Sequence, residues 1–348
     1  MTDLVIRPLV AGEENLFDSM PDPLPQLRQV AYADGIAGGG YRPENTWVAL
    51  RAGRLVGRAA WLLPPGAVGA PWLDRFDLDA DPESRSRLLS HGSRTGRAVL
   101  LLHGYTLAPE QYEGLAEEFF DRGYSVWIPR APQHGTVDRT AHHRVEAGGL
   151  TTYAAKGWAV AAALGDEVGV VGISGGAVLA AWLAQVPGTV VRHLLLLSPF
   201  FGPNPRQAPA YAVKPLIVLY GRRILRDRVT SRGYSLAAVT QYLTIARTLP
   251  KPPRRTGLRT AAVAISPLDR VVDLRAAVAV PRRIADANAI PLRVCTLPEA
   301  LGVEHNTLNL AALGTDGDEW RRRYVALYEG ATVPESSPAT ADNAPTRR

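Results

Sequence analysis

A serine stands in a glycine-rich turn between an apolar strand and an apolar helix. Residues 172–176 read Gly-Ile-Ser-Gly-Gly and fit the pattern G-x-S-x-G around Ser174. The valine-rich run at 168–171 predicts a buried strand, and residues 177–184, which hold no proline and no charge, predict a helix. Between two such elements the serine backbone is strained, and its hydroxyl lies at the carboxyl end of the sheet. Ser174 is therefore a candidate nucleophile.

A serine hydroxyl is a weak nucleophile at neutral pH, so this hypothesis requires partners elsewhere in the chain. They are a base, an acid that orients the base, and hydrogen-bond donors for the oxyanion. From residue 96 onward the pattern alternates between strands and helices. Further strands are expected at 98–102, 124–128, 193–197, 260–265 and 291–297. Helices are expected at 109–121, 146–164 and 318–328. The alternation predicts a mostly parallel sheet with helices on both faces.

The first of these strands runs directly into His103, Gly104 and Tyr105. A strand followed by His-Gly-aromatic, a later G-x-S-x-G turn, and then an aspartate and a histidine in that order resembles the α/β-hydrolase fold. The resemblance is to the serine esterases and lipases of that family, and it covers about residues 96–330.

The resemblance implies an α/β fold with a mostly parallel, twisted sheet and a helical cap inserted into the core. The core is expected at 97–200 and 261–329, and the cap at 201–260. In the esterases and lipases of this family two backbone N–H groups form the oxyanion hole. By position in this sequence they are those of Tyr105 and Gly175, and they matter because charge develops on the carbonyl oxygen only in the transition state.

The base is expected among the seven histidines. His305 follows the strand at 291–297 and precedes a helix expected at 307–313, which is where the family keeps its base. The remaining histidines are expected to be structural or to lie in loops: His91, His103, His134, His142, His143 and His193. The one in the His-Gly-aromatic turn is expected to hold that turn by hydrogen bonds. No metal site is expected, because the two histidines that are adjacent in the sequence have side chains that point apart.

Asp269 is the expected acid. It lies four residues beyond the strand at 260–265 and shows the D-x-x-V spacing of the family. Its carboxylate would accept the imidazole N–H and stabilise the imidazolium. Asp273 is the alternative, although it stands where the next helix should begin and could instead cap that helix.

These residues predict acyl transfer to water through an acyl-enzyme on Ser174, with no metal or organic cofactor. The predicted function is a serine hydrolase that cleaves a small-molecule carboxylic ester. A second hypothesis is a thioesterase or acyltransferase that works in a biosynthetic pathway on an anionic acyl carrier. A third is a non-enzymatic binding protein with the hydrolase fold, and a fourth is an acetyltransferase.

The acetyltransferase hypothesis rests on the N-terminal segment. The opening IRPL and the later TWVALRAGRLVGRAAW, which predicts strands at 46–50 and 54–61, resemble the first strands of GNAT-type acetyltransferases. The pyrophosphate-binding loop of that family, R/Q-x-x-G-x-G/A, does not follow here. The interpretation kept for residues 1–80 is therefore a small α+β appendage or the first antiparallel strands of the main sheet. A linker is expected at 81–96, and a disordered tail at 330–348.

The composition predicts a soluble cytoplasmic protein of one large domain or two modest ones. The chain has 348 residues, 46% of them hydrophobic, yet no apolar run reaches the roughly 18 residues of a membrane helix. Cys295 is the single cysteine, so no internal disulfide forms, and we expect a buried, inert thiol. Nearly all of the basic residues are arginine, which indicates GC-rich codon usage. No nucleic-acid partner is expected from the basic balance.

The segment expected to form the cap is strongly basic. It holds twelve lysines and arginines against one acid, Asp227, so its formal charge is +11 although the whole chain carries +6. Codon usage does not remove acids from one segment. Apolar stretches at 215–220 and 236–249 predict cap helices. Two interpretations of the charge stay open, a solvated surface without a specific partner and a cap that attracts an anionic substrate or acyl carrier.

Overall fold

The computed structural model describes residues 4–10, 12–13, 15–16, 46–51, 54–62, 72–74, 84–136, 138–231, 233–309 and 317–332. The tail predicted at 330–348 lies outside these ranges from residue 333 onward. Of the helix expected at 307–313, residues 307 and 308 form a turn, and residues 310–313 lie outside the described part of the chain.

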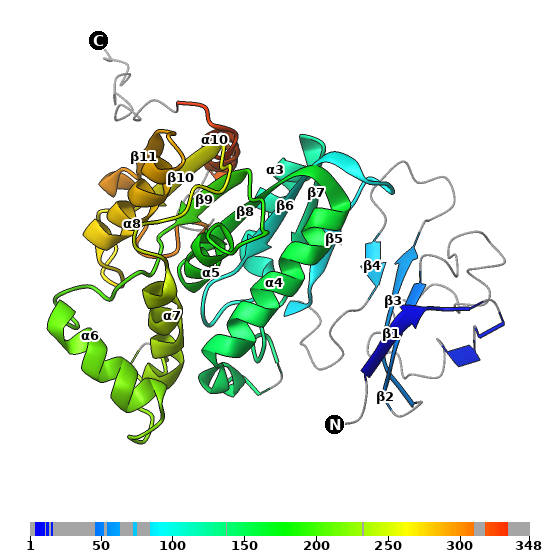
Figure 1. Cartoon of the computed structure of the whole chain (residues 1–348), viewed down its shortest axis with the longest axis horizontal. Helices are drawn as coiled ribbons and strands as arrows, with labels where there is room; N and C mark the ends of the chain where they lie inside the picture. Colours follow the sequence, from blue (N-terminus) through cyan, green and yellow to red (C-terminus); the bar gives the residue numbers. More distant parts are fainter. Residues whose placement is uncertain are drawn as a thin grey trace, which may run out of the picture.

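The strands of the described residues form one eleven-stranded sheet in the order β1-β2-β3-β4-β5-β7-β6-β8-β9-β10-β11 (Figure 1). In chain order they are β1 Leu4–Pro8, β2 Thr46–Arg51, β3 Arg54–Leu62, β4 Trp72–Asp74, β5 Arg87–Leu89, β6 Thr95–Leu102, β7 Tyr124–Ile128, β8 Gly165–Ile173, β9 His193–Leu197, β10 Thr260–Ile265 and β11 Leu292–Thr296. The six strands from β6 onward pair in parallel, and all earlier pairings are antiparallel. The α/β-hydrolase fold is therefore present, with an antiparallel N-terminal extension of its sheet.

The order of the strands reverses at β6. The chain passes from β6 to β7 on one side, and then returns to β8 on the other side of β6. The loops that leave β6 and β8 therefore run in opposite directions from neighbouring strands. In open α/β sheets a crevice forms at this point beyond the carboxyl ends of the strands, and ligands bind there.

Helices cover both faces of the sheet. On one face lie α4 Ala147–Leu164, α5 Gly175–Leu183 and α8 Leu274–Ala287, and on the other lie α3 Leu115–Asp121 and α10 Gly317–Glu329. Short helical turns lie in the loops: η4 Pro109–Tyr112, η5 Ala141–Arg144 and η7 Glu299–Leu301. Alternate residues of β6 serve the two layers, since Leu100 and Leu102 pack on the α4 and α5 side and Val99 and Leu101 on the α3 and α10 side.

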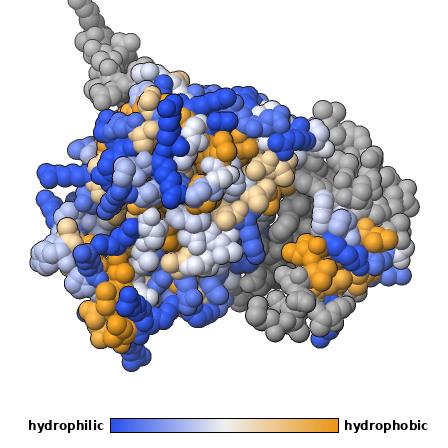
Figure 2. Space-filling model, in the orientation of Figure 1, coloured by the Kyte–Doolittle hydropathy of each residue, from blue (hydrophilic) through white to orange (hydrophobic). Residues whose placement is uncertain are grey.

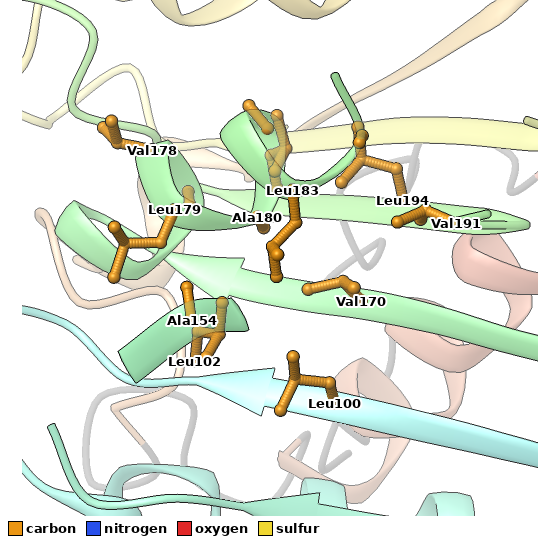
Figure 3. Packing of buried hydrophobic residues seen from close by; sticks show 14 of the residues in the cluster. Leu100, Leu102, Ala154, Val170, Val178, Leu179, Ala180, Leu183, Val191 and Leu194 are labelled. Atoms are coloured by element: carbon orange, nitrogen blue, oxygen red, sulfur yellow. The ribbon is translucent and has the colours of Figure 1, made fainter. Parts of the chain in front are cut away.

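Figure 3 shows the first of these layers from close by. Leu100 and Leu102 of β6 and Val170 of β8 lie beneath Leu179 and Leu183 of α5. All five side chains are buried. Each such side chain stabilises the fold by about 1.5–3 kcal/mol relative to an exposed one.

The helix predicted at 109–121 is two helices. It divides into η4 and α3 at Gly114, whose φ of 80° lies outside the helical region. The predicted helices at 146–164 and 318–328 form as α4 and α10 with small shifts of their ends, and Glu146 is the N-cap of α4.

Part of the segment predicted as a linker at 81–96 belongs to the sheet. It contains β5, which pairs antiparallel with β7, and the first residues of β6. Leu88 of β5 is buried in the core, and β4 joins β5 through the pair Trp72 and Leu89. The segment is polar in composition, and its one buried leucine, Leu88, is too weak a signal to predict a strand.

Between β9 and β10 the chain forms a helical cap. Its elements are α6 Ala210–Leu216, the π-helical turn η6 Ile217–Gly221 and α7 Leu236–Thr248. Figure 1 shows them at the lower left, and α7 packs against α4 and α5. Asp227 and Ser235 cap the start of α7, since the Asp227 carboxylate accepts from Ser235 Oγ–H and from the Ala237 N–H. Ser235 Oγ in turn accepts the Ala238 N–H.

In the part of the chain that is described, every helix is too short or too polar to cross a membrane. The thiol of Cys295, expected to be buried, is only half-buried, because β11 is the edge strand of the sheet.

Candidate active site

The turn between β8 and α5 holds Ser174 in a strained backbone conformation, with φ 54° and ψ −114°. The backbone packs so tightly around this turn that side chains are excluded at the glycines on either side of the serine. A Cβ on Gly172 would lie 2.3 Å from the carbonyl oxygen of Gly176, and one on Gly176 would lie 2.0 Å from the carbonyl oxygen of Leu102. The glycines are therefore required by the turn that presents the hydroxyl.

The structure brings the three predicted side chains of the site together. Ser174 Oγ lies 2.8 Å from Nε2 of His305, and Nδ1 of the same ring lies 2.7 Å from Oδ2 of Asp269. The histidine side chain is 18% exposed and the aspartate side chain is 0% exposed. This contact fixes the tautomer, because a carboxylate accepts the Nδ1–H and leaves Nε2 free to accept the serine O–H.

Backbone groups orient the buried carboxylate of Asp269. Its Oδ1 accepts the N–H groups of Val271 and Val272 at 2.7 and 3.2 Å, which leaves Oδ2 for the imidazole. Asp273, the alternative acid, has another role. Its carboxylate accepts the N–H groups of Arg275 and Ala276 at 2.9 and 3.2 Å and caps the start of α8.

The turn after β6 is held by the buried imidazole of His103. Its Nε2 accepts the Ala131 N–H at 2.9 Å, so the ring proton is on Nδ1, which donates to the Gly104 carbonyl at 3.0 Å. The turn carries the Tyr105 N–H, one of the two predicted oxyanion donors. Among the described residues neither this N–H nor that of Gly175 donates to another group, and both residues line the cleft beside the serine.

A cleft of about 830 Å³ lies beneath the cap at the serine. This volume falls in the range of small-molecule sites. Apolar side chains from both the core and the cap line it: Leu107, Phe200, Leu216, Leu236, Val239, Leu243 and Val271. Hydroxyl and amide side chains supply most of the polar groups, and the amides are Gln111, Gln207, Asn306 and Asn309. Within the described chain no lysine or arginine lines the cleft, and Glu304 is its one carboxylate.

The side chain of Tyr105 joins the site to the cap. Its hydroxyl accepts the N–H of Ser235, the N-cap of α7, at 3.3 Å. The ring packs against the rings of Tyr234 and Tyr242, and burial raises the pKa of Tyr105 above its usual value. The sequence indicated only the backbone of this residue, since contacts between the turn and the cap have no local signal.

No sequence pattern predicted a role for Gln111 either. It lies in η4, lines the cleft and connects two loops through its side-chain amide. A glutamine in a polar helical turn is common, and a motif search has no reason to select it.

Within the described residues no group of three or more histidine, cysteine, aspartate or glutamate side chains is placed to hold an ion. His134 is buried, and its pKa is lowered to about 3, mainly by burial and to a smaller extent by the nearby His103. His193 lies between Glu167 and Thr260 at the opposite end of the parallel strands from the serine.

The sequence model of the alpha/beta hydrolase family matches residues 99–342. Among solved structures, one from work on LipS and LipT, two metagenome-derived lipolytic enzymes, matches with a TM-score of 0.52 and 19% identity, covering 72% of this chain and 99% of that one. The monoacylglycerol lipase of Paleococcus ferrophilus matches with a TM-score of 0.51 and 15% identity, covering 70% and 98%. These structures are similar in fold. A comparison with curated protein sequences found no match.

Proposed function

Since the chain belongs to the alpha/beta hydrolase family, we propose that it is a serine hydrolase that cleaves carboxylic esters. One observation carries this proposal: the hydrogen-bonded path from Ser174 Oγ through His305 to Asp269, at the wall of a cleft of small-molecule size. The arrangement supports nucleophilic attack because the base touches the hydroxyl and the buried acid fixes the base.

In the first half of the reaction Nε2 of His305 takes the proton of Ser174 as Oγ attacks the ester carbonyl carbon. The carbonyl π electrons move to the oxygen, and the N–H groups of Tyr105 and Gly175 donate to that oxyanion. The tetrahedral intermediate then collapses, the bond to the leaving oxygen breaks, and the imidazolium gives its proton to the departing alcohol. Asp269 accepts the Nδ1–H throughout and stabilises the imidazolium.

In the second half water enters and gives a proton to Nε2 of His305 as its oxygen attacks the acyl-enzyme. Collapse of the second intermediate releases the carboxylic acid and returns the proton to Ser174. The turn held by His103 keeps its oxyanion donor in place before substrate binds. Such fixed donors are worth about 10²–10³ in kcat each.

A thioesterase or acyltransferase activity on an anionic acyl carrier receives no support from the cleft. No lysine or arginine of the described residues lines it, and Glu304 would repel a negative group there. Neutral esters with an apolar acyl or alcohol part fit the apolar wall better. We place the activity in the cytoplasm as a prediction that rests on the single cysteine.

Labelling with a fluorophosphonate probe tests the proposal. The folded wild type is expected to take up one probe per chain, and Ser174→Ala none. Ser198→Ala is the matched control, because it removes a buried hydroxyl at the end of β9 that has no hydrogen-bond partner in the described structure. The control should label like the wild type. Folded wild type that takes up no probe and hydrolyses no p-nitrophenyl ester would overturn the proposal.

A further inference from the structure

The positive charge of the cap faces solvent. Six basic residues lie between residues 206 and 228, and all six are exposed: Arg206, Lys214, Arg222, Arg223, Arg226 and Arg228. None of them forms an ion pair with a described residue, and none lines the cleft. This charge is therefore available to a partner outside the molecule rather than to a substrate in the cleft.

The one acid of this segment does not neutralise it. Both carboxylate oxygens of Asp227 are engaged at the start of α7, where they accept from Ser235 Oγ–H at 2.6 Å and from the Ala237 N–H at 2.9 Å. Asp227 keeps its single negative charge and offsets only one of the six positive charges, so residues 206–228 remain strongly positive.

Large apolar side chains share this surface with the basic residues. Tyr211 is 84% exposed, Ile224 is 61% exposed and Val229 is 52% exposed, and Val218 and Leu225 are also exposed. The helix α6 buries none of its residues. Figure 2 shows a hydrophobic area bordered by hydrophilic side chains at the lower left, where Figure 1 places α6 and η6. Monomeric proteins seldom leave such a patch uncovered without a binding role.

We propose that this cap surface, the exposed side chains of residues 206–229, docks on an anionic lipid surface. Charge complementarity selects this occupant. The arginines and the lysine would contact lipid phosphates while the neighbouring apolar side chains enter the boundary of the acyl chains. A lipid surface covers separate protruding side chains without a matching groove, whereas a folded acidic protein requires complementary shape.

Sedimentation with vesicles tests this docking separately from catalysis, because Ser174→Ala protein serves for every measurement. This protein is expected to sediment with vesicles that contain phosphatidylglycerol, and much less with phosphatidylcholine alone. The double variant Arg222→Glu/Arg226→Glu should bind the anionic vesicles at least tenfold more weakly. Tyr211→Ser/Ile224→Ser should also bind more weakly, at unchanged charge.

A matched control is available on α8, where Arg282 and Arg283 are exposed outside the cap. Arg282→Glu/Arg283→Glu changes the net charge equally and should bind anionic vesicles like the parent. Equal loss of binding in this control would overturn the proposal, since it would indicate attraction to the overall charge. Equal binding to both vesicle types, or binding to an acidic carrier protein and not to vesicles, would also overturn it. None of these outcomes depends on whether esters are cleaved.

Discussion

Gln111 Nε2 donates a hydrogen bond to Asn306 Oδ1 at 3.2 Å, while Oε1 of the same side chain accepts the Gly104 N–H at 2.8 Å. One amide therefore connects the turn that carries the Tyr105 N–H with the loop that carries His305. These two loops follow different strands and hold the proposed oxyanion donor and the proposed base. Their relative position depends on a side chain that takes no part in the chemistry.

Replacement of Gln111 by alanine is expected to lower kcat for a p-nitrophenyl ester by about 10-fold to 100-fold, with a small change in KM. The reason is that misplacement by a fraction of an ångström weakens transition-state contacts more than substrate binding. Steady-state kinetics provide the measurement. Gln207→Ala is the control, because Gln207 also lines the cleft but donates to the Arg270 carbonyl. Similar losses in both variants would indicate that Gln111 only shapes the wall.

Variants of the two aspartates after β10 are expected to differ, one in activity and the other in stability. Asp269→Asn should reduce kcat by about 10³–10⁴-fold with little loss of folding, because an amide cannot stabilise the imidazolium. Asp273→Ala should retain kcat and lose about 1 kcal/mol of stability, because it removes the cap of α8. Kinetics and denaturant unfolding of both variants check the assignment. A crippled Asp273→Ala enzyme beside an active Asp269→Asn enzyme would reverse it.

The glycine after the nucleophile turn is expected to be intolerant of a single methyl group. Gly176→Ala places a Cβ against the Leu102 carbonyl, which is backbone and cannot move aside, so a loss of more than about 3 kcal/mol or failure to fold is expected. Gly148→Ala in α4 meets nothing within 4 Å and should be neutral or more stable by up to about 1 kcal/mol. Urea unfolding of the two proteins gives the comparison. A stable Gly176→Ala protein would contradict the geometry of the turn.

The buried imidazole of His134 is expected to lower the free energy of unfolding in weak acid. Its pKa is about 3 in the folded protein, mainly because of burial, against about 6.5 in an unfolded chain. Between these values the unfolded chain binds the extra proton, so stability falls as pH drops from about 6.5 toward 3. His134→Gln should be less stable at pH 8, where it loses the contact with the Pro132 carbonyl, and should show a flatter dependence on pH. The slope should decrease by up to about 1.4 kcal/mol per pH unit.

Denaturant unfolding between pH 5 and pH 8 measures this slope. His91→Gln is the control, because His91 is exposed and stacks on Phe120 at the surface. It should leave the slope near that of the wild type. A His134→Gln protein whose slope equals that of the wild type would indicate that other groups cause the acid sensitivity.

The sequence predicted the strands that carry the site and the side chains that end them. The bounds of β7, β9 and β10 agree with prediction because these strands are buried apolar runs, whose pattern is local. The helix predicted at 109–121 is divided at Gly114. The positive φ of this residue depends on the surrounding packing, so the sequence pattern did not predict the break. The segment expected to be a linker contains the strand that includes Leu88, because this strand pairs with β7, which lies far along the chain.

The same distinction applies inside the site. Ser174 was selected by its motif between a strand and a helix, and Asp269 and His305 by the resemblance to the hydrolase family, which places each of them after a strand of the parallel sheet. Gln111 and the hydroxyl of Tyr105 act through contacts between loops and across to the cap, which no spacing rule encodes. Residues that do the proposed chemistry were therefore predictable, whereas residues that hold the loops together were not.

The hydrogen bond between the Tyr105 hydroxyl and the Ser235 N–H means that the cap is not an interchangeable module. A chimaera that receives residues 201–259 from another hydrolase would meet a tyrosine hydroxyl at the base of its new helix. A donor segment without a free N–H at that point removes the hydrogen bond of this half-buried hydroxyl, at a cost of about 0.5–1.5 kcal/mol. Grafted caps therefore need a phenylalanine at position 105 or a helix that starts at the same place.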